Sequence, residues 1–351
     1  MERETATKFI HELLELLVKQ KGSDLFITAG FPPAIKVDGK IIPVSKTPLT
    51  PQHTIELTRS VMNDKQAAEF ESTKECNFAI APPGIGRFRC NAFLQQGRVG
   101  MAMRTINTTI PTFEELNLPP VLKDVCMSKR GIMMFIGATG AGKSTSMAAL
   151  LGYRNENSYG HIITIEDPIE FVHESKRCLV NQREVHRDTL GFSEALRSAL
   201  REDPDVILVG EMRDLETIRL ALTAAETGHL VFGTLHTSSA AKTIDRIVDV
   251  FPGEEKDMVR SMLSESLRAV VSQTLMKKNT GGRVAAHEIM IGTPAIRNLI
   301  REGKIAQMYS SIQTGGAQGM QTLDQCLAEL VAKGMVSKEE ARYKAQNKDS
   351  L

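Results

Sequence analysis

The sequence predicts an α/β protein in which a small α+β domain precedes a larger domain built on a mostly parallel sheet. Residues 1–107 contain short strand-like segments separated by turns rich in Pro and Gly, which is typical of an antiparallel sheet. In residues 116–351, apolar strand-like runs alternate with helical segments instead. Pro111 lies between the two patterns, so residues 108–115 are expected to form an interdomain linker.

The first domain is expected to contain two helices and six strands. An amphipathic helix is predicted over Thr7–Gln20, where apolar residues recur with helical spacing, and a second helix from about Pro51 to Glu71. The predicted strands are Leu25–Thr28, Ile35–Val37, Ile41–Val44, Phe78–Ile80, Arg87–Leu94 and Val99–Ile106.

The second domain is expected to contain buried parallel strands, because its strand-like runs are apolar at most positions. These runs are Ile132–Ile136, Ile162–Ile165, Val206–Val209 and Leu230–Leu235. A long helix is predicted over Glu254–Lys277, on the evidence of an apolar stripe that includes Met258 and Leu263. The chain from about residue 290 is expected to be helical.

Composition describes an ordinary soluble protein. The net charge is +1 and 24% of the residues are charged, so neither nucleic acid nor a membrane surface is expected as the main partner. No apolar run approaches the roughly 18 residues of a membrane span, and the N-terminus lacks a signal peptide's features, which favours a cytoplasmic location. The five cysteines are far apart and are expected to be reduced and mostly buried.

A glycine-rich octet follows the strand-like run that ends at Ile136. It fits the pattern G-x-x-x-x-G-K-[ST], in which backbone N–H groups and a helix N-terminus surround phosphate oxygens. Lys143 is expected to reach the β- and γ-phosphates of ATP, and Ser144 to bind Mg²⁺. The expected nucleotide-binding residues of this segment are Gly137, Ala138, Thr139, Gly140, Ala141, Gly142, Lys143, Ser144 and Thr145.

Carboxylates follow two of the predicted parallel strands, at the edge where such sheets bind ligands. Glu211 comes just after Val206–Val209 and is a candidate for catalysis and for Mg²⁺ binding. Glu166, Asp167 and Glu170 form an acidic turn after Ile162–Ile165. Glu170 is the preferred residue for activating water, and Glu166 is the alternative.

Histidines and arginines complete the set of candidates. His229 and His236 flank Leu230–Leu235, and His236, at the carboxyl end, is the stronger candidate to sense phosphate or to bond a catalytic acid. Phosphoryl transfer also needs positive charge against the transferred group. Five arginines are candidates for this role, and the alternative for each is a surface salt bridge. The candidate arginines are Arg87, Arg89, Arg104, Arg201 and Arg213.

Four motifs, GATGAGKS, ITIEDPIEF, VILVGE and HLVFGTLH, together resemble those of the hexameric secretion ATPases, and within them the retraction ATPases of type IV pili. The resemblance implies a PAS-like first domain, a RecA-like ATPase domain and a ring of six subunits. It implies that Glu170 is the catalytic glutamate, that Glu211 ends the Walker B segment, and that His229 and His236 form a histidine box. Residues 295–300, AIRNLI, match a family motif implicated in retraction.

The same resemblance implies that Arg87, Arg89 and Arg104 approach the nucleotide as the small domain moves, with Arg201 as a further contact. The implied function is an ATP-hydrolysing motor for pilus retraction and twitching motility, peripheral at the inner membrane. Its implied partners are a membrane platform protein and a paralogous retraction ATPase. The chain as far as Asp167 resembles the PilU branch more, and the chain from Glu170 onward resembles the PilT branch.

Three other functions stay open at this point. One is an accessory ATP-binding subunit that modulates a partner ring, and another is a pilus-extension or type II secretion ATPase. The third is a RecA-like translocase on nucleic acid, which the composition disfavours because the chain has no Trp and only 5% aromatic residues.

Overall fold

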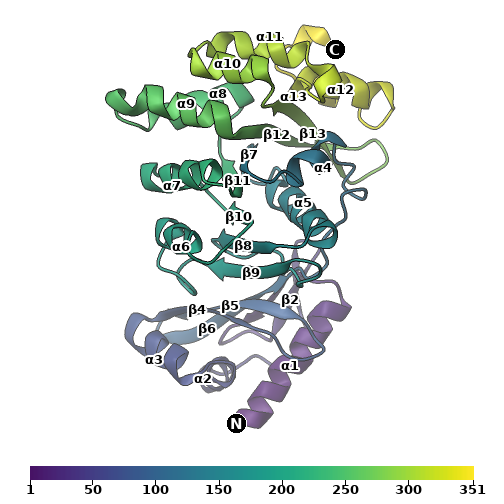
Figure 1. The fold of residues 1–351 in the computed structure, drawn as a ribbon. Coiled ribbons are helices and arrows are strands. Elements are labelled where there is room, and N and C mark those ends of the chain that lie inside the picture. Colours follow the sequence, from purple (N-terminus) through teal and green to yellow (C-terminus); the bar gives the residue numbers. More distant parts are fainter. The chain divides into compact units, whose positions relative to one another are not determined.

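A computed structural model describes all residues from Met1 to Leu351 (Figure 1). The chain divides into two compact units. The first comprises Met1–Thr109 and the short segment Glu170–Val172, which joins it through a parallel bridge between Phe171 and Asn107. The second comprises Ile110–Ile169 and His173–Leu351. The sequence contains no signal for the return of residues 170–172 to the first unit.

The first unit is an antiparallel sheet covered by helices. Its strand order is β3-β2-β1-β6-β5-β4. The core lies between the sheet and α1, whose Ile10, Leu14 and Leu17 are fully buried. The elements are α1 (Arg3–Lys19), β1 (Asp24–Ile27), β2 (Ala34–Val37), β3 (Lys40–Pro43), α2 (Pro51–Ser60), α3 (Asp64–Thr73), β4 (Glu75–Ile80), β5 (Arg87–Gln95) and β6 (Arg98–Ile106).

The second unit is a seven-stranded sheet in the order β13-β12-β7-β11-β10-β8-β9, parallel except for β13, which runs antiparallel to β12. The predicted α/β class, with a mostly parallel sheet after an α+β domain, is confirmed. The strands are β7 (Gly131–Ile136), β8 (His161–Glu166), β9 (Leu179–Glu184), β10 (Val206–Val209), β11 (Leu230–Leu235), β12 (Leu267–Lys277) and β13 (Arg283–Ile291).

Helices cover both faces of this sheet (Figure 1). Because side chains alternate along a strand, Met133 and Phe135 of β7 enter one core while Ile132, Met134 and Ile136 enter the other. The first core includes α4 (Val121–Cys126) and α5 (Lys143–Asn157). The second includes α6 (Phe192–Ala199), α7 (Leu215–Glu226), α8 (Ala240–Asp249), α9 (Lys256–Ser266), α10 (Pro294–Arg301) and α11 (Met308–Gln313).

A smaller apolar cluster holds the C-terminal helices α12 (Leu323–Ala332) and α13 (Lys338–Lys344) against the β12–β13 hairpin. Met276 and Val284 of the hairpin pack there with Leu327 and Leu330. The hairpin therefore contacts the C-terminal helices at one end, while β12 pairs with β7 along its other part.

The predicted long helix over Glu254–Lys277 is wrong. Only α9 is helical, and the chain then extends as β12 from Leu267 to Lys277. A strand buried on both faces is apolar at successive positions, so its spacing also satisfies a helical stripe. The β-branched pair Val270 and Val271, both fully buried, was the available signal for a strand.

The predicted helix from Pro51 to Glu71 is two helices, α2 and α3. The break falls at Asn63, whose side chain accepts the backbone N–H of Gln66 and so caps α3. Strands β9 and β13 were not predicted. The polar residues of β9 gave it no apolar pattern, since it lies at the edge of the sheet.

Candidate functional site

The glycine-rich octet of residues 137–144, called the phosphate loop below, runs from the end of β7 into the first turn of α5. All six residues of β7 are buried, and the chain leaves the sheet at Gly137 with a φ of 146°. A side chain at Gly137 would place its Cβ 2.5 Å from the carbonyl oxygen of Gln273, so only glycine fits. Gly142, with a φ of 82°, precedes the first residue of α5. The free N–H groups of that first turn are suited to an anion.

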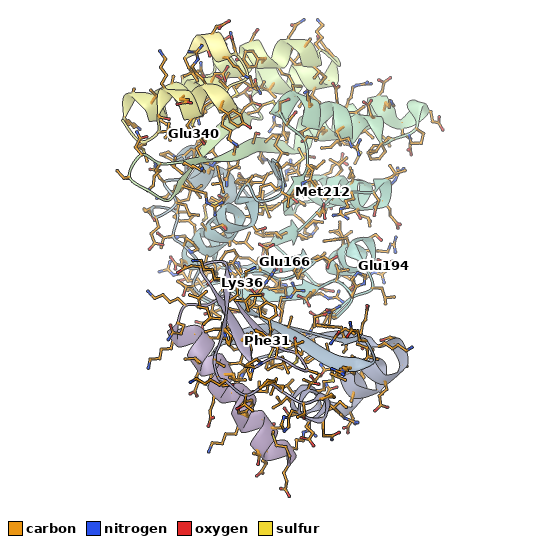
Figure 2. The ribbon with its side chains drawn as sticks, turned by 180° about the vertical axis from the view of Figure 1, so that it is seen from behind. Phe31, Lys36, Glu166, Glu194, Met212 and Glu340 are labelled. Atoms are coloured by element: carbon orange, nitrogen blue, oxygen red, sulfur yellow. The ribbon has the colours of Figure 1, made fainter.

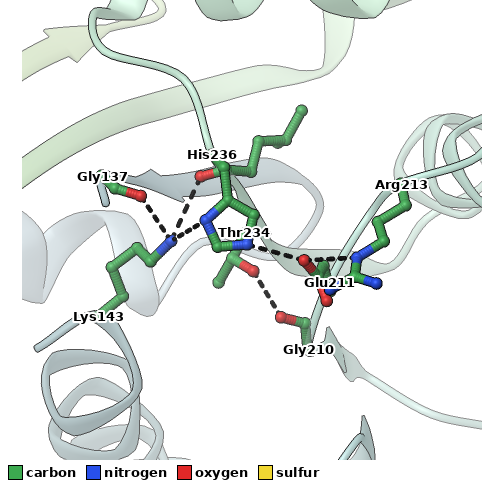
Figure 3. Close-up of polar contacts among 8 residues, drawn as sticks. Gly137, Lys143, Gly210, Glu211, Arg213, Thr234 and His236 are labelled. Atoms are coloured by element: carbon green, nitrogen blue, oxygen red, sulfur yellow. Dashed lines mark hydrogen bonds and ion pairs between the residues drawn. The ribbon is translucent and has the colours of Figure 1, made fainter. Parts of the chain in front are cut away.

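Lys143 is buried beneath this loop, with 8% of its surface exposed. Its Nζ donates to the carbonyl oxygen of Gly137 at 2.8 Å and lies 3.2 Å from Nδ1 of His236 (Figure 3). Burial lowers the pKa of Lys143, and the nearby Glu211 carboxylate opposes this shift. The amine is thus held by neutral acceptors, which a phosphate oxygen can replace with a stronger, charged partner.

Strand register brings His236 to Lys143. β7 and β11 are parallel with Ile136 opposite Leu235, so Gly137 and His236 are the next residues along each strand. An ammonium group can only donate, so Nδ1 of His236 accepts and Nε2 carries the proton. Nε2 then donates to Oε1 of Glu211 at 2.7 Å.

Glu211 receives a second contact from Arg213, whose Nε lies 2.7 Å from the same oxygen (Figure 3). Burial alone would raise the pKa of Glu211, but the hydrogen bonds from Arg213 and His236 outweigh burial and hold it below its ordinary value. The carboxylate is therefore ionised at neutral pH. Both contacts use Oε1, which leaves Oε2 for a ligand.

The donor set fits a magnesium ion bound with nucleotide. Ser144 is exposed on the first turn of α5, and Glu211 presents an ionised carboxylate beyond β10. A hydroxyl and a carboxylate are hard oxygen ligands of the kind Mg²⁺ takes, with the remaining positions left to water and phosphate. The loop residues Ala138, Thr139 and Gly140 are also exposed.

Glu166 ends β8 at the same edge of the sheet. Glu166 and Met212, labelled in Figure 2, lie at or just past the carboxyl ends of β8 and β10. Oε2 of Glu166 accepts hydrogen bonds from the Thr164 hydroxyl at 2.7 Å and the Gln182 amide at 3.1 Å. Glu170, the preferred water-activating residue, is exposed and belongs to the segment that joins the first unit.

His229 and Arg201 lie near the amino ends of β11 and β10, away from the phosphate loop. His229 precedes β11, where its Nδ1 contacts the carbonyl oxygen of Ala224 at 3.0 Å and its own carbonyl accepts the N–H of Gly131. Arg201 is exposed in the turn between α6 and β10. Neither residue joins Lys143, Glu211 and His236 within this unit, and their roles toward nucleotide stay predictions.

The first unit carries three of the predicted arginines on one face of its sheet. Arg89 on β5 is directly opposite Arg104 on β6, and Arg87 lies two residues before Arg89, so all three project from the same face. The alternate residues Phe88 and Cys90 are buried in the core. Arg104 Nε forms an ion pair with Asp24 at 3.0 Å.

Arg297, in the predicted motif at 295–300, is a clamp on the backbone. Its guanidinium donates to the carbonyl oxygens of Gly292, Glu265 and Leu267 at 2.7, 3.0 and 3.1 Å. These carbonyls lie after β13, at the end of α9 and at the start of β12. Arg297 thus fixes α10 to both strands of the hairpin at its open end, a role for which the motif itself gave no physical signal.

A family model described as Type II/IV secretion system protein matches residues 2–343. The chain belongs to this family. Among its relatives, the type IV pilus retraction ATPase PilT of Pseudomonas aeruginosa is 66% identical over 96% of this chain and 98% of that protein. The type IV pilus ATPase PilU of the same organism is 48% identical over 97% of this chain and 89% of that protein.

A solved member of the secretion family, the pilus retraction motor PilT with bound ADP, superposes with a TM-score of 0.91. It is 47% identical, and the match covers 97% of this chain and 98% of that one. The predicted resemblance to retraction ATPases and the predicted RecA-like ATPase domain after a smaller α+β domain are confirmed. No helix of the chain is both long and apolar enough to cross a bilayer.

Proposed function

We propose that the protein is an ATPase that powers retraction of type IV pili and thereby twitching motility. The observation that carries the proposal is the buried Lys143 in a glycine-rich loop, held by neutral acceptors beside the ionised pair of Glu211 and Arg213. The 66% identity to PilT, over 96% of this chain, supports the same conclusion.

Each residue of the loop region has a role in this proposal. The N–H groups of residues 137–145 bind the phosphates, and Lys143 exchanges the Gly137 carbonyl for a phosphate oxygen. Ser144 and Glu211 hold Mg²⁺, which neutralises phosphate charge when bound. When Lys143 binds phosphate, it releases His236, which stays hydrogen-bonded to Glu211. His236 thus couples nucleotide binding at Lys143 to Glu211.

The remaining roles extend beyond the second unit. Glu170 takes the proton of the attacking water, and Arg89 or Arg104 brings a guanidinium to the γ-phosphate when the first unit moves. His229 and Arg201 lie at the strand ends away from the phosphate loop of their own subunit. In a ring of six subunits, they can instead add contacts to the nucleotide of a neighbouring subunit. Attachment to the inner membrane is through a platform protein rather than through the chain itself.

Phosphate release by the purified full-length protein tests the enzyme assignment. The wild type is expected to release phosphate steadily from ATP and Mg²⁺, and Lys143→Ala to lose this activity and bind ADP weakly. Lys338→Ala, at an exposed lysine that begins α13, is the matched control and is expected to behave as wild type. Undiminished hydrolysis by Lys143→Ala would remove the loop from the mechanism.

The accessory role, left open by the sequence, is the second candidate, and the chain is also 48% identical to PilU. It predicts that the isolated protein binds ADP, releases no phosphate alone, and alters the rate of a purified retraction ATPase added to it. Stimulation by single-stranded DNA would instead favour the nucleic-acid translocase.

A further inference from the structure

We infer that Gln273, on β12, is a positioning residue that holds the phosphate loop in its binding conformation, with His287 on β13 orienting the Gln273 amide. The inference rests on the proposed nucleotide function of the loop. It concerns the antiparallel hairpin, which none of the four motifs includes.

Gln273 makes three side-chain hydrogen bonds inside the second unit, with 3% of its surface exposed. Its Nε2 donates to the carbonyl oxygen of Ala141 at 2.7 Å. Its Oε1 accepts from the Ser146 hydroxyl at 2.8 Å and contacts Nε2 of His287 at 2.9 Å. A carbonyl can only accept, so the amide nitrogen must face Ala141, and the other two groups must donate.

The backbone of Gln273 also touches the loop. Ser272 pairs with Ile136, the last residue of β7, which places Gln273 beside Gly137. The carbonyl oxygen of Gln273 is what a Cβ on Gly137 would meet, and its Nε2 would lie 3.0 Å from a Cβ on Gly142. One residue therefore contacts the start of the loop, its middle and the first turn of α5.

His287 fixes which way the amide points. Its ring is 2% exposed, and burial lowers its pKa to about 4, so it is neutral at pH 7. The neutral ring carries its proton on Nε2 and donates it to Oε1 of Gln273. The carbonyl of His287 accepts from the Gln321 amide at 2.9 Å, which joins β13 to the segment before α12.

Glu288, the next residue of β13, holds the segment that follows His236. Side chains of consecutive strand residues point to opposite faces, so Glu288 is directed away from Gln273. Oε1 of Glu288 accepts the N–H of Ala240 at 2.9 Å, at the start of α8 and four residues after His236. His287 and Glu288 thus anchor the phosphate loop and the His236 segment from one strand.

Gln273→Met tests the inference, because Met keeps the length of the side chain and loses both hydrogen-bonding groups. The buried Ala141 carbonyl is then left without its partner, and the loop spends less time in the binding conformation. The expected result is an ADP dissociation constant raised about tenfold, with KM for ATP rising more than kcat falls. Affinity is measured with fluorescent ADP well below the melting temperature.

Two controls separate positioning from packing. Ser264→Ala removes a buried hydroxyl that donates to the Ser261 carbonyl within α9, and it should lower the melting temperature without changing ADP affinity. Ser146→Ala keeps the contact between Gln273 and Ala141 and should change affinity about twofold or less. A purely structural role for Gln273 would give the Ser264→Ala pattern and would overturn the inference.

His287→Phe serves if Gln273→Met does not fold. It keeps a buried ring and removes the donor that orients the amide, so a threefold or larger loss of ADP affinity is expected, on the order of one lost hydrogen bond. Affinity within twofold of wild type in whichever variant folds refutes the inference. If the wild type itself binds no ADP, the proposed function fails instead, and the two outcomes are distinct.

Discussion

The phosphate-loop region of the second unit and the arginine face of the first unit carry positive charge in different ways. Lys143 is buried and bonded to carbonyl and imidazole acceptors, and Glu211 nearby is matched by Arg213. On the arginine face of the first unit, formed by Arg87, Arg89 and Arg104, the last two are cross-strand neighbours. Arg104 is 72% exposed in its pair with Asp24. Asp24 offsets part of the positive charge that the two arginines place side by side.

The difference indicates two functions for charge. The loop region is assembled by hydrogen bonds before nucleotide arrives, so its residues should govern affinity. The arginines belong to the first unit and are proposed to reach phosphate only when that unit moves, so they should govern a step in which phosphate charge develops. Four experiments can break or sharpen this comparison.

The largest effect is expected from Glu170→Gln, which tests whether the first unit's segment supplies the group that activates water. The amide keeps the size of the side chain but cannot take a proton, so turnover should fall about 10³-fold with ADP affinity unchanged. Glu166→Gln, in the second unit, is the matched control and should fall much less. The reverse order of phosphate-release rates would place the base in the second unit.

Arginine substitutions come next. Arg89→Ala should lower turnover about 10²-fold while ADP affinity changes little, because the guanidinium acts on developing charge. Lysine should rescue poorly, since it lacks the planar fork of donors. Arg104→Ala is best made with Asp24→Asn, because Asp24 is 7% exposed and would otherwise lose its cationic partner. An equal loss of affinity and turnover would contradict the proposed division of roles.

Substitutions of the two histidines that flank β11 should differ in effect. His236→Ala breaks the link between Lys143 and Glu211 and should lower turnover about tenfold, roughly the effect of losing a charge-assisted hydrogen bond. His229→Ala, at the far end of the strand, should stay within twofold if each subunit acts alone. A large effect of His229→Ala that disappears on dilution would mean that His229 acts on the nucleotide of a neighbouring subunit.

The smallest effect concerns pH. The folded-state pKa of Glu211 lies below its ordinary value of 4.5, so its ion pairs stabilise the fold above pH 4.5, and this contribution is lost as pH falls through the lowered pKa. Arg213 is 77% exposed, which limits the contribution to about 0.5 kcal/mol. The difference in melting temperature between wild type and Glu211→Gln should therefore stay constant from pH 7 to about 4.5 and shrink only as pH falls below 4.5. A difference that already shrinks between pH 7 and 5 would contradict this account.

Much of the loop side of the site was predictable from sequence, because its chemistry follows local rules. The octet at 137–144 predicted a strand, a glycine turn and a helix, and β7 and α5 flank it as expected. Glu211 and His236 were placed by one further rule, that residues after parallel strands share an edge. That rule explains why Lys143, Glu211 and His236 lie together. It also explains why His229 and Arg201, at the amino ends of their strands, lie away from the loop.

Other features depended on contacts between distant parts of the chain. The sequence by itself determined the fold class, the phosphate loop and the carboxylates at the sheet edge, because glycine conformation and apolar runs are properties of neighbouring residues. Only the tertiary structure decided that Leu267–Lys277 is a strand, that Glu170–Val172 joins the first unit, and that Gln273 holds Ala141. The physical reason is that a strand obtains its hydrogen bonds from other segments, and a buried amide finds its partners only when those segments meet.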